Sequence, residues 1–342
     1  MASSLVLGWR ALYPAPVTAP NPPHATRTLR YGDAAIAEAA ALIAAGEPVA
    51  VPTETVYGLA ADATESAAVA RIYEAKGRPS FNPLIVHVLD VAAAERIAVF
   101  DDQARALAEA FWPGPLTLVL PLRPDAGIAS LVTAGLDTIA LRVPAHRAMR
   151  ALLAATGKPL AAPSANASNG ISPTCAEHVA GSLGGRIALV IDDGPTSAGL
   201  ESTIVKDGEV LRPGPITAEQ ILMFPGEGRG PVSDRPATGP RPSPGDKKVT
   251  APGQLASHYA PSKPLRLNAT NAADDEWLIG FGPIAGDDTL SAAGDLTEAA
   301  AALFAALHRA DASPRPRIAV APILDIGIGA AINDRLRRAA HR

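Results

Sequence analysis

Pairs of polar side chains separated by one residue follow apolar segments at several places along the chain. One such pair is Lys76 and Arg78, in the segment KGR. Another is Ser164 and Asn166, in the segment SAN. Because alternate side chains of an extended segment point the same way, each pair is predicted to act at one place. Two cations beside a hydroxyl and an amide suit a triphosphate, since arginine offers a planar fork and lysine a point charge.

Further polar residues lie close to predicted strand ends. Thr53 and Thr55 belong to PTETVYG, directly after an apolar run, while Ser202 belongs to EST and Arg212 begins RPG. The sequence contains no GxxxxGK(S/T), HExxH, CxxC or GxSxG motif, which are the signatures of several common phosphate, metal and hydrolase sites. What remains is a set of cations and hydrogen-bonding groups without an obvious nucleophile.

Each of these groups also has an ordinary structural interpretation. Lys76 and Arg78 could end a helix, where cations offset the helix dipole. The paired threonines and the SAN segment could be strand and turn residues, and His87 could be a core histidine satisfied by its neighbours. Composition and spacing by themselves therefore indicate an α/β protein with an anion-binding pocket.

The composition limits the classes of function. The chain of 342 residues has a formal net charge of -4 and is 48% hydrophobic. An acidic chain argues against a general nucleic-acid coat, which needs a basic surface. Cys175 is the single cysteine, so no internal disulfide is possible, as is usual in a reducing compartment. No apolar run approaches the ~20 residues that span a bilayer, and the start lacks the pattern of a secretory signal. We therefore expect a cytoplasmic protein without a membrane segment.

Apolar patterning predicts alternating strands and helices between residues 27 and 220, after a Pro-rich extension at 1–26 that is predicted to be disordered. Asp33 and Thr174 are expected to cap helices, and Asp207-Gly208 to turn a hairpin between strands at 201–205 and 209–211. The other predicted helices and strands alternate along the chain: helices at 33–45, 66–76, 101–111 and 146–155, and strands at 48–52, 84–88, 116–120, 138–143, 160–162 and 188–191. Such an alternation with hairpins predicts a mixed sheet.

The composition changes from Phe224 to Gly253, where Pro and Gly are frequent and large apolar residues are nearly absent. This change lies within residues 221–263, which include the segment SHYAP. This stretch cannot bury a core, so it is predicted to be a flexible linker. The strand and helix pattern then resumes, with strands at 265–267, 277–281 and 318–321 and helices at 297–308 and 329–340. Residues 264–342 are thus predicted to form a small second α/β domain.

In order along the chain, these segments resemble the YrdC-like family of threonylcarbamoyl-AMP synthases. The resemblance runs almost continuously from Gly46 to Thr217, and the family's KxR and SxN pairs are present as KGR and SAN. The matching stretches are VPTETVYGLAADA, KGRPSFNPLIVHV, FWPGPLTLVL, TIALRVPAHR, APSANASNGISPT, DDGPTSAGLESTIV and LRPGPI. PGQLASHYAPSKPL is similar to the linker motif of the family's long, two-domain form. The resemblance implies a twisted α/β sheet over a concave active-site cavity, followed by a small Rossmann-like α/β domain.

The resemblance also implies a reaction: L-threonine, bicarbonate and ATP give threonylcarbamoyl-AMP and pyrophosphate, for the modification of tRNA next to the anticodon. Lys76 and Arg78 are the implied catalytic residues, and a partner machinery would transfer the threonylcarbamoyl group to tRNA. Mg²⁺ is expected on the phosphates, without a dedicated protein ligand set. The implied ATP-binding residues are Lys76, Arg78, Asn82, Thr138, Ser164, Asn166, Ser172, Arg212, His258 and Tyr259. The implied threonine-binding residues are Thr55, His87, Arg142, Ala162, through its backbone, and Ser202.

Two other functions use the same kind of fold. An RNA-binding module could grip tRNA in a concave basic pocket, but the acidic net charge and the lack of interleaved aromatic and basic residues disfavour it. A carbamoyl-transfer step in metallocentre maturation is disfavoured by the absence of Cys-rich zinc motifs and of an acylphosphatase-like segment.

Overall fold

The structure is a computed structural model that describes residues 25–224 and 258–341. Nearly all of the predicted extension at 1–26, and most of the predicted linker at 221–263, lie outside the described residues. No helix within the described ranges combines the length and the apolarity needed to cross a bilayer.

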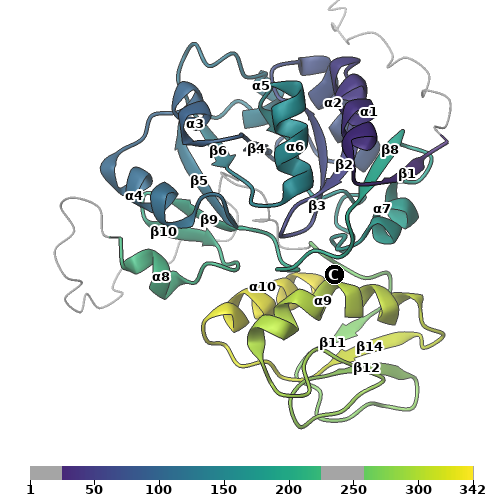
Figure 1. Ribbon diagram of the computed structural model, residues 1–342. Helices are drawn as coiled ribbons and strands as arrows, with labels where there is room; N and C mark the ends of the chain where they lie inside the picture. The colour runs from purple at the N-terminus through teal and green to yellow at the C-terminus, as the bar shows by residue number, and fades with distance from the viewer. Residues whose placement is uncertain (1–24, 225–257, 342) are drawn as a thin grey trace, which may run out of the picture.

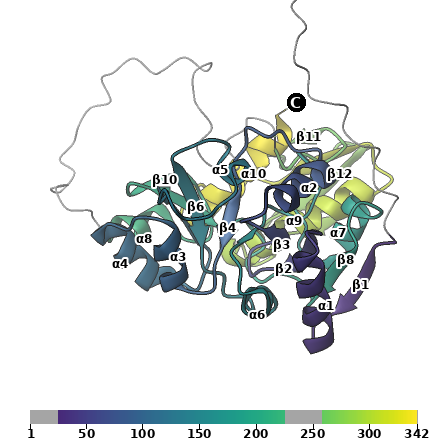
Figure 2. The same cartoon turned by 90° about the horizontal axis from the view of Figure 1, so that it is seen from above.

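A mixed ten-stranded sheet organises residues 25–224 (Figure 1). The strand order is β1-β8-β2-β3-β7-β4-β6-β5-β9-β10, with parallel and antiparallel neighbours interspersed. The strands are β1 (Arg27–Arg30), β2 (Val49–Pro52), β3 (Tyr57–Asp62), β4 (Ile85–His87), β5 (Leu116–Pro121), β6 (Thr138–Arg142), β7 (Leu160–Ala161), β8 (Leu189–Asp192), β9 (Thr203–Lys206) and β10 (Glu209–Arg212). Figure 2 shows β1 at one end of this domain and β10 at the other. The mixed α/β fold expected from the sequence is confirmed.

Helices cover both faces of the large sheet. Alternation along β2 shows this, since Val49 and Val51 join a core with α1 and α6, whereas Ala50 joins a core with α2, α4 and α7. Successive side chains of a strand point to opposite faces, so these are two separate layers of packing. The helices are α1 (Asp33–Ala44), α2 (Ser66–Lys76), α3 (Val91–Ile97), α4 (Asp102–Phe111), α5 (Ser130–Thr133), α6 (Arg147–Thr156), α7 (Ala176–Leu183) and α8 (Ala218–Leu222).

A second sheet of four parallel strands organises the C-terminal domain, in the order β11-β14-β12-β13. Its elements are β11 (Leu265–Arg266), β12 (Glu276–Gly280), β13 (Asp288–Thr289), α9 (Leu296–Ala312), β14 (Arg317–Val320) and α10 (Ile328–Ala340). Both helices lie between this sheet and the larger domain (Figure 1). The His308 ring of α9 stacks on the His178 ring of α7, with centroids 3.7 Å apart. The small α/β domain predicted from the sequence is confirmed, and it packs directly on the larger domain.

Some local expectations were wrong. Lys76 is the last residue of α2, and Gly77 ends that helix in the left-handed conformation with φ 60°, so Lys76 and Arg78 do not belong to one extended segment. Ser164 and Asn166 lie in a tight turn instead, since the Asn166 N–H donates to the Ser164 carbonyl at 3.0 Å. The expectation that the two side chains of each pair point the same way, as in an extended strand, is therefore wrong for both pairs.

The sequence pattern also missed elements and shifted caps. β3 (YGLAAD) was not predicted, because Gly and Ala carry little of the β-branched signal by which strands are recognised. β1 (RTLR) was missed because it is a short polar edge strand. Gly32 and Cys175 occupy the N-cap positions expected for Asp33 and Thr174, each one residue away.

The packing around β6 generates a stability prediction. Leu141 is fully buried between β4 and β5, so Leu141→Ala is expected to lower the free energy of unfolding by about 2–5 kcal/mol. Leu222 is 69% exposed, so Leu222→Ala is the control and is expected to change stability by no more than about 0.5 kcal/mol. Urea denaturation measures both, and equal stability of the two variants would contradict the central position of β6.

Candidate functional site

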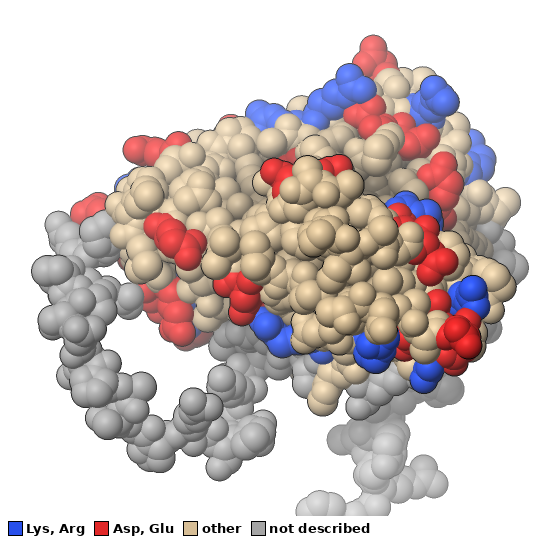
Figure 3. Space-filling model, turned by 90° about the horizontal axis from the view of Figure 1, so that it is seen from below, with Lys and Arg blue, Asp and Glu red and all other residues tan. Residues whose placement is uncertain are grey.

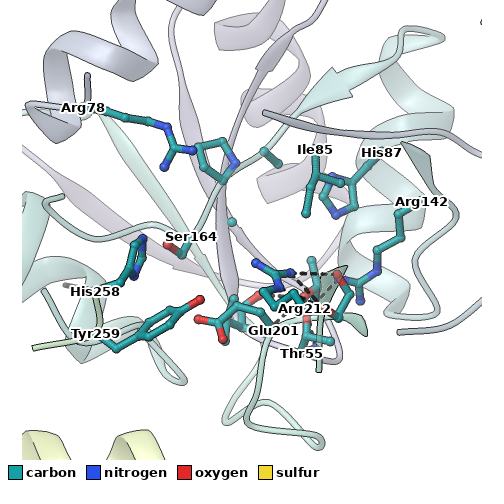
Figure 4. Close-up of a pocket in the computed structure, with 16 residues that line it drawn as sticks. Thr55, Arg78, Ile85, His87, Arg142, Ser164, Glu201, Arg212, His258 and Tyr259 are labelled. Atoms are coloured by element: carbon teal, nitrogen blue, oxygen red, sulfur yellow. Dashed lines mark hydrogen bonds between the residues drawn. The ribbon is translucent and has the colours of Figure 1, made fainter. Parts of the chain in front are cut away.

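A pocket opens where several strands of the large sheet end. Its wall combines the β2–β3 loop, the ends of β4, β6 and β10, the turn after β7 and the residues before β9. His258 and Tyr259, which precede the C-terminal domain, complete the wall (Figure 4). The pocket is therefore built from segments that are far apart in the sequence.

Arg142 organises one end of the pocket. Its Nη1 donates to the Thr55 hydroxyl at 2.8 Å, its Nη2 to a Glu54 carboxylate oxygen at 2.5 Å, and its Nε to the Gly114 carbonyl at 3.1 Å. Burial raises the pKa of Glu54, but the charge and hydrogen bonds of Arg142 outweigh burial and hold that pKa below its usual value. Three of the five guanidinium N–H groups are thus used inside the protein, which leaves two for a ligand carboxylate.

His87 lies on β4 directly beside Arg142 on β6. Burial, reinforced by the positive charge of Arg142, lowers the pKa of His87 to about 3. Neither ring nitrogen has a hydrogen-bond partner of normal geometry among the described residues, so His87 is a neutral imidazole with free polar atoms at the pocket wall.

The other end of the pocket is electropositive. Arg78 donates to the carbonyls of Asn82 and Pro83 at 3.3 and 3.0 Å, and burial lowers its pKa to about 10. Burial lowers the pKa of His258 well below its usual value, and four nearby cations, Arg78 foremost, lower it further. A neutral histidine surrounded by cations marks a region that favours an anion.

Arg212, at the end of β10, joins this electropositive region. Its guanidinium donates to the Ser202 carbonyl at 2.9 and 3.1 Å and to the Ser202 hydroxyl at 3.1 Å. The same hydroxyl lies 2.7 Å from the Thr117 hydroxyl. In the part of the chain that the structure describes, Arg212 is 4% exposed and donates to uncharged oxygens of Ser202. Its positive charge therefore remains available to a ligand in the pocket.

Lys76 stands behind the pocket wall. Its ammonium donates to the Ser164 carbonyl at 2.6 Å and, by a shorter contact, to the Asn166 carbonyl. Burial, together with repulsion from Arg78, lowers the pKa of Lys76 well below its usual value. In this structure the lysine therefore fixes the SAN turn, which presents Ser164 to the pocket (Figure 4).

The structure brings most of the residues expected at the site together. Ten line the pocket: Thr55, Arg78, His87, Arg142, Ala162, Ser164, Ser202, Arg212, His258 and Tyr259. Five do not line it: Lys76, Asn82, Thr138, Asn166 and Ser172.

Three of these five lie just outside the wall. The Asn82 carbonyl supports Arg78, the Asn166 side-chain amide donates to the carbonyls of Ala167 and Gly170, and the Ser172 hydroxyl donates to Glu201. Thr138 begins β6, four residues from Arg142 at the other end of the strand, which corresponds to about 13 Å of strand length.

Known protein families match both domains of the chain. The model of the Sua5/YciO/YrdC family, described as telomere recombination, matches residues 41–214. The model of the threonylcarbamoyl-AMP synthase C-terminal domain matches residues 216–341. The chain is 41% identical to the threonylcarbamoyl-AMP synthase of Bacillus subtilis, over 92% of this chain and 95% of that protein. The chain belongs to the threonylcarbamoyl-AMP synthase family.

A second relative and its solved structure also match both domains of this chain. The threonylcarbamoyl-AMP synthase of Pyrococcus abyssi is 38% identical over 88% of this chain and 93% of that protein. The crystal structure of P. abyssi Sua5 complexed with L-threonine superposes with a TM-score of 0.78 and 35% identity, over 92% of this chain and 97% of that chain. The long two-domain form of the synthase family is thereby confirmed, as is the twisted mixed α/β sheet.

Sequence reasoning assigned no role to three charged residues at the site. Glu54 and Glu201 belong to quoted motifs, but their ionic partners lie 88 and 134 residues away. Arg335 sits in the basic run RLRR of α10, which looks like an exposed helix end. Only the contact between the two domains shows that Arg335 is buried.

The neutral state of His87 generates a prediction of pH dependence. Its pKa falls from 6.5 to about 3 on folding, so the unfolded chain binds a proton that the folded chain does not, and stability is lost as the pH falls from 6.5 towards 3. Between pH 7 and pH 5 this loss is about 2 kcal/mol. In His87→Gln this part of the loss is expected to disappear, as measured by urea denaturation at both pH values. An identical pH dependence of the two proteins would contradict a buried neutral imidazole.

Proposed function

We propose that this chain condenses L-threonine, bicarbonate and ATP into threonylcarbamoyl-AMP and pyrophosphate, the intermediate for threonylcarbamoylation of tRNA next to the anticodon. The observation that carries the proposal is a pocket with two chemically distinct ends in a chain 41% identical to a threonylcarbamoyl-AMP synthase. One end, around Arg142 and His87, suits an amino acid. The other, around Arg78 and Arg212, suits a nucleotide polyphosphate.

The reaction asks for positioning more than for covalent catalysis. The threonine amine takes up the carbon of bicarbonate, forming a carbamate and releasing water. A carbamate oxygen then forms a bond to the α-phosphorus of ATP, and the bond between that phosphorus and pyrophosphate breaks. Charge develops on the phosphate oxygens, so fixed cations such as Arg78 and Arg212 stabilise the transition state.

The amino-acid end offers matching groups. The two remaining N–H groups of Arg142 suit the threonine carboxylate. Because His87 is neutral, it can accept a hydrogen bond from the amine without adding a positive charge beside it. Thr55 and Ser202 supply hydroxyls near the substrate side chain, and the Ala162 backbone lies in the same wall.

The proposed role of Mg²⁺ is limited to the phosphates. The described residues contain no group of three or more His, Cys, Asp or Glu arranged to hold a metal ion. Glu54 and Glu201, at the pocket wall, are each bound to an arginine. We infer that Mg²⁺ enters with ATP, held by phosphate oxygens and water, and neutralises phosphate charge there.

The proposed division of the chain follows from these roles. Residues 27–220 carry the synthase chemistry, and residues 264–342 form the second domain. Residues 221–263 connect them, and the described end of this linker supplies His258 and Tyr259 to the pocket wall. A separate machinery would transfer the product's threonylcarbamoyl group to tRNA, in the cytoplasm where tRNA is modified.

The face shown in Figure 3, as far as described residues form it, carries basic and acidic side chains scattered around an uncharged centre. Such a face offers little to RNA, whose phosphates bind to concentrated positive charge.

Incubation with ATP, L-threonine and bicarbonate, followed by mass detection of threonylcarbamoyl-AMP, tests the proposal directly. In the same assay, Arg78→Ala is expected to lower turnover by ~10²-fold or more, since a preorganised charge donor is lost. Lys76→Ala is expected to lower it similarly, by releasing the SAN turn. Arg30→Ala, on the exposed edge strand β1, is the control and is expected to leave turnover unchanged. Product formation by both site variants at the rate of the control would contradict the site.

Amino-acid selectivity gives an independent prediction. A site that hydrogen-bonds the threonine hydroxyl leaves its own buried polar groups unpaired when valine binds. Valine is therefore expected to have a kcat/KM lower by ~10³-fold or more, while serine retains part of the activity. Competition assays with the three amino acids measure this order. Equal use of valine and threonine would show that Thr55 and Ser202 do not read the side chain.

A further inference from the structure

Arg335, on helix α10 of the C-terminal domain, is the largest fully buried side chain among the described residues. Its Nε donates to a Glu201 carboxylate oxygen at 2.8 Å, and its Nη1 donates to Asp334 at 2.8 Å. Glu201 belongs to the larger domain and lines the pocket. A cation of one domain thus binds a carboxylate in the active-site wall of the other.

Arg335 also contacts Tyr259, which precedes the C-terminal domain and lines the pocket. Its guanidinium carbon lies 5.2 Å from the centroid of the Tyr259 ring, in cation–π geometry. Tyr259 is 1% exposed and adopts φ 63°, a conformation that a residue other than glycine keeps only when its surroundings impose it. Packing of its ring on Phe304 of α9, 5.6 Å away, adds to these constraints. Both helices of the C-terminal domain therefore hold Tyr259.

Glu201 is an unusual group for the wall of an anion-binding pocket. It faces the pocket on the same side as Tyr259 and near Arg212 (Figure 4). Ser172 donates to one of its carboxylate oxygens and Arg335 to the other, so the carboxylate is fixed in place. Without Arg335 its negative charge would repel a phosphate group and compete for the cations that should bind it.

We propose that Arg335 is a positioning residue through which the C-terminal domain completes the nucleotide end of the pocket. It neutralises and orients Glu201 and holds Tyr259 against the pocket without touching the substrate. This inference rests on ATP being the ligand of that end, as in the proposed function. Among the described residues Arg335 contacts Glu201, Asp334 and Tyr259 rather than Arg142 or His87, so a selective loss of nucleotide binding is predicted.

A merely structural ion pair between the domains would behave differently. Breaking such a pair would affect both substrates together, through general loosening of the fold. If instead Arg335 acts by neutralising Glu201, then removing the Glu201 charge makes Arg335 dispensable for ATP binding. A double-mutant cycle of Arg335→Met and Glu201→Gln separates the two roles, since it isolates the energy that the pair shares.

The test measures the dissociation constant of ATP with Mg²⁺ by calorimetry, and KM and kcat for threonine at saturating ATP, in the full chain. Arg335→Met is expected to weaken ATP binding about 10-fold or more, with the threonine KM within about 3-fold of wild type. In the Glu201→Gln background the same change is expected to alter ATP binding by less than about 3-fold. Arg337→Met is the matched control, because Arg337 lies on the same helix with a side chain 60% exposed, and it is expected to match wild type.

Several results would overturn the inference. Unchanged ATP binding in Arg335→Met would do so, as would an equal loss in both Glu201 backgrounds or a parallel loss for threonine. If Arg335→Met does not fold, Arg335→Lys replaces it in the cycle, with a smaller loss expected in the same direction and the same criteria. A wild-type chain that neither binds ATP nor forms product would instead refute the proposed function, which keeps the two failures distinct.

Discussion

Positive charge buried in and behind the walls of one pocket is the constraint on which the rest of the site depends. Lys76, Arg142, Arg212 and Arg335 are all less than 5% exposed, and a buried charge is costly unless the protein compensates it. Among the described residues, Arg142 and Arg335 form ion pairs with carboxylates, whereas Lys76 and Arg212 donate to carbonyl and hydroxyl oxygens. The two kinds of compensation have different consequences. The arginines paired with carboxylates fix the pocket walls, whereas the cations bound to neutral oxygens leave a positive potential that attracts an anion.

This constraint explains why the pocket residues come from so many elements. Neutral oxygens that can hold a buried cation are backbone carbonyls at strand ends and in turns, where the sheet no longer uses them. The SAN turn supplies two to Lys76, the loop after α2 supplies two to Arg78, and Ser202 supplies its own to Arg212. The large mixed sheet matters because it brings those strand ends to one place.

The C-terminal domain belongs to the same electrostatic arrangement. Phe304 of α9 packs on Tyr259, and the Arg338 carbonyl of α10 accepts a hydrogen bond from the His258 N–H. Arg335 of α10 links Tyr259 to Glu201. Close contact between the domains is required for this, as Gly199 illustrates: its φ is +67°, and a Cβ there would lie 2.4 Å from the Ala301 carbonyl of α9. A reactive mixed anhydride such as the proposed product benefits from a wall that excludes water on this side.

The sequence by itself determined the family, the order of most helices and strands and the majority of the pocket residues. It could do so because motifs such as KGR and SAN are contiguous, and because apolar periodicity is a local property of the chain. The tertiary structure alone decided which polar atoms face the pocket. Gly77 ends a helix between Lys76 and Arg78, and Ser164 and Asn166 lie in a tight turn. The rule that alternate side chains point the same way holds for extended chain and does not apply to either pair. The tertiary structure also decided the pairing of Glu201 with Arg335. An ion pair between residues 134 positions apart, in two domains, arises from packing and leaves no local signal in the sequence.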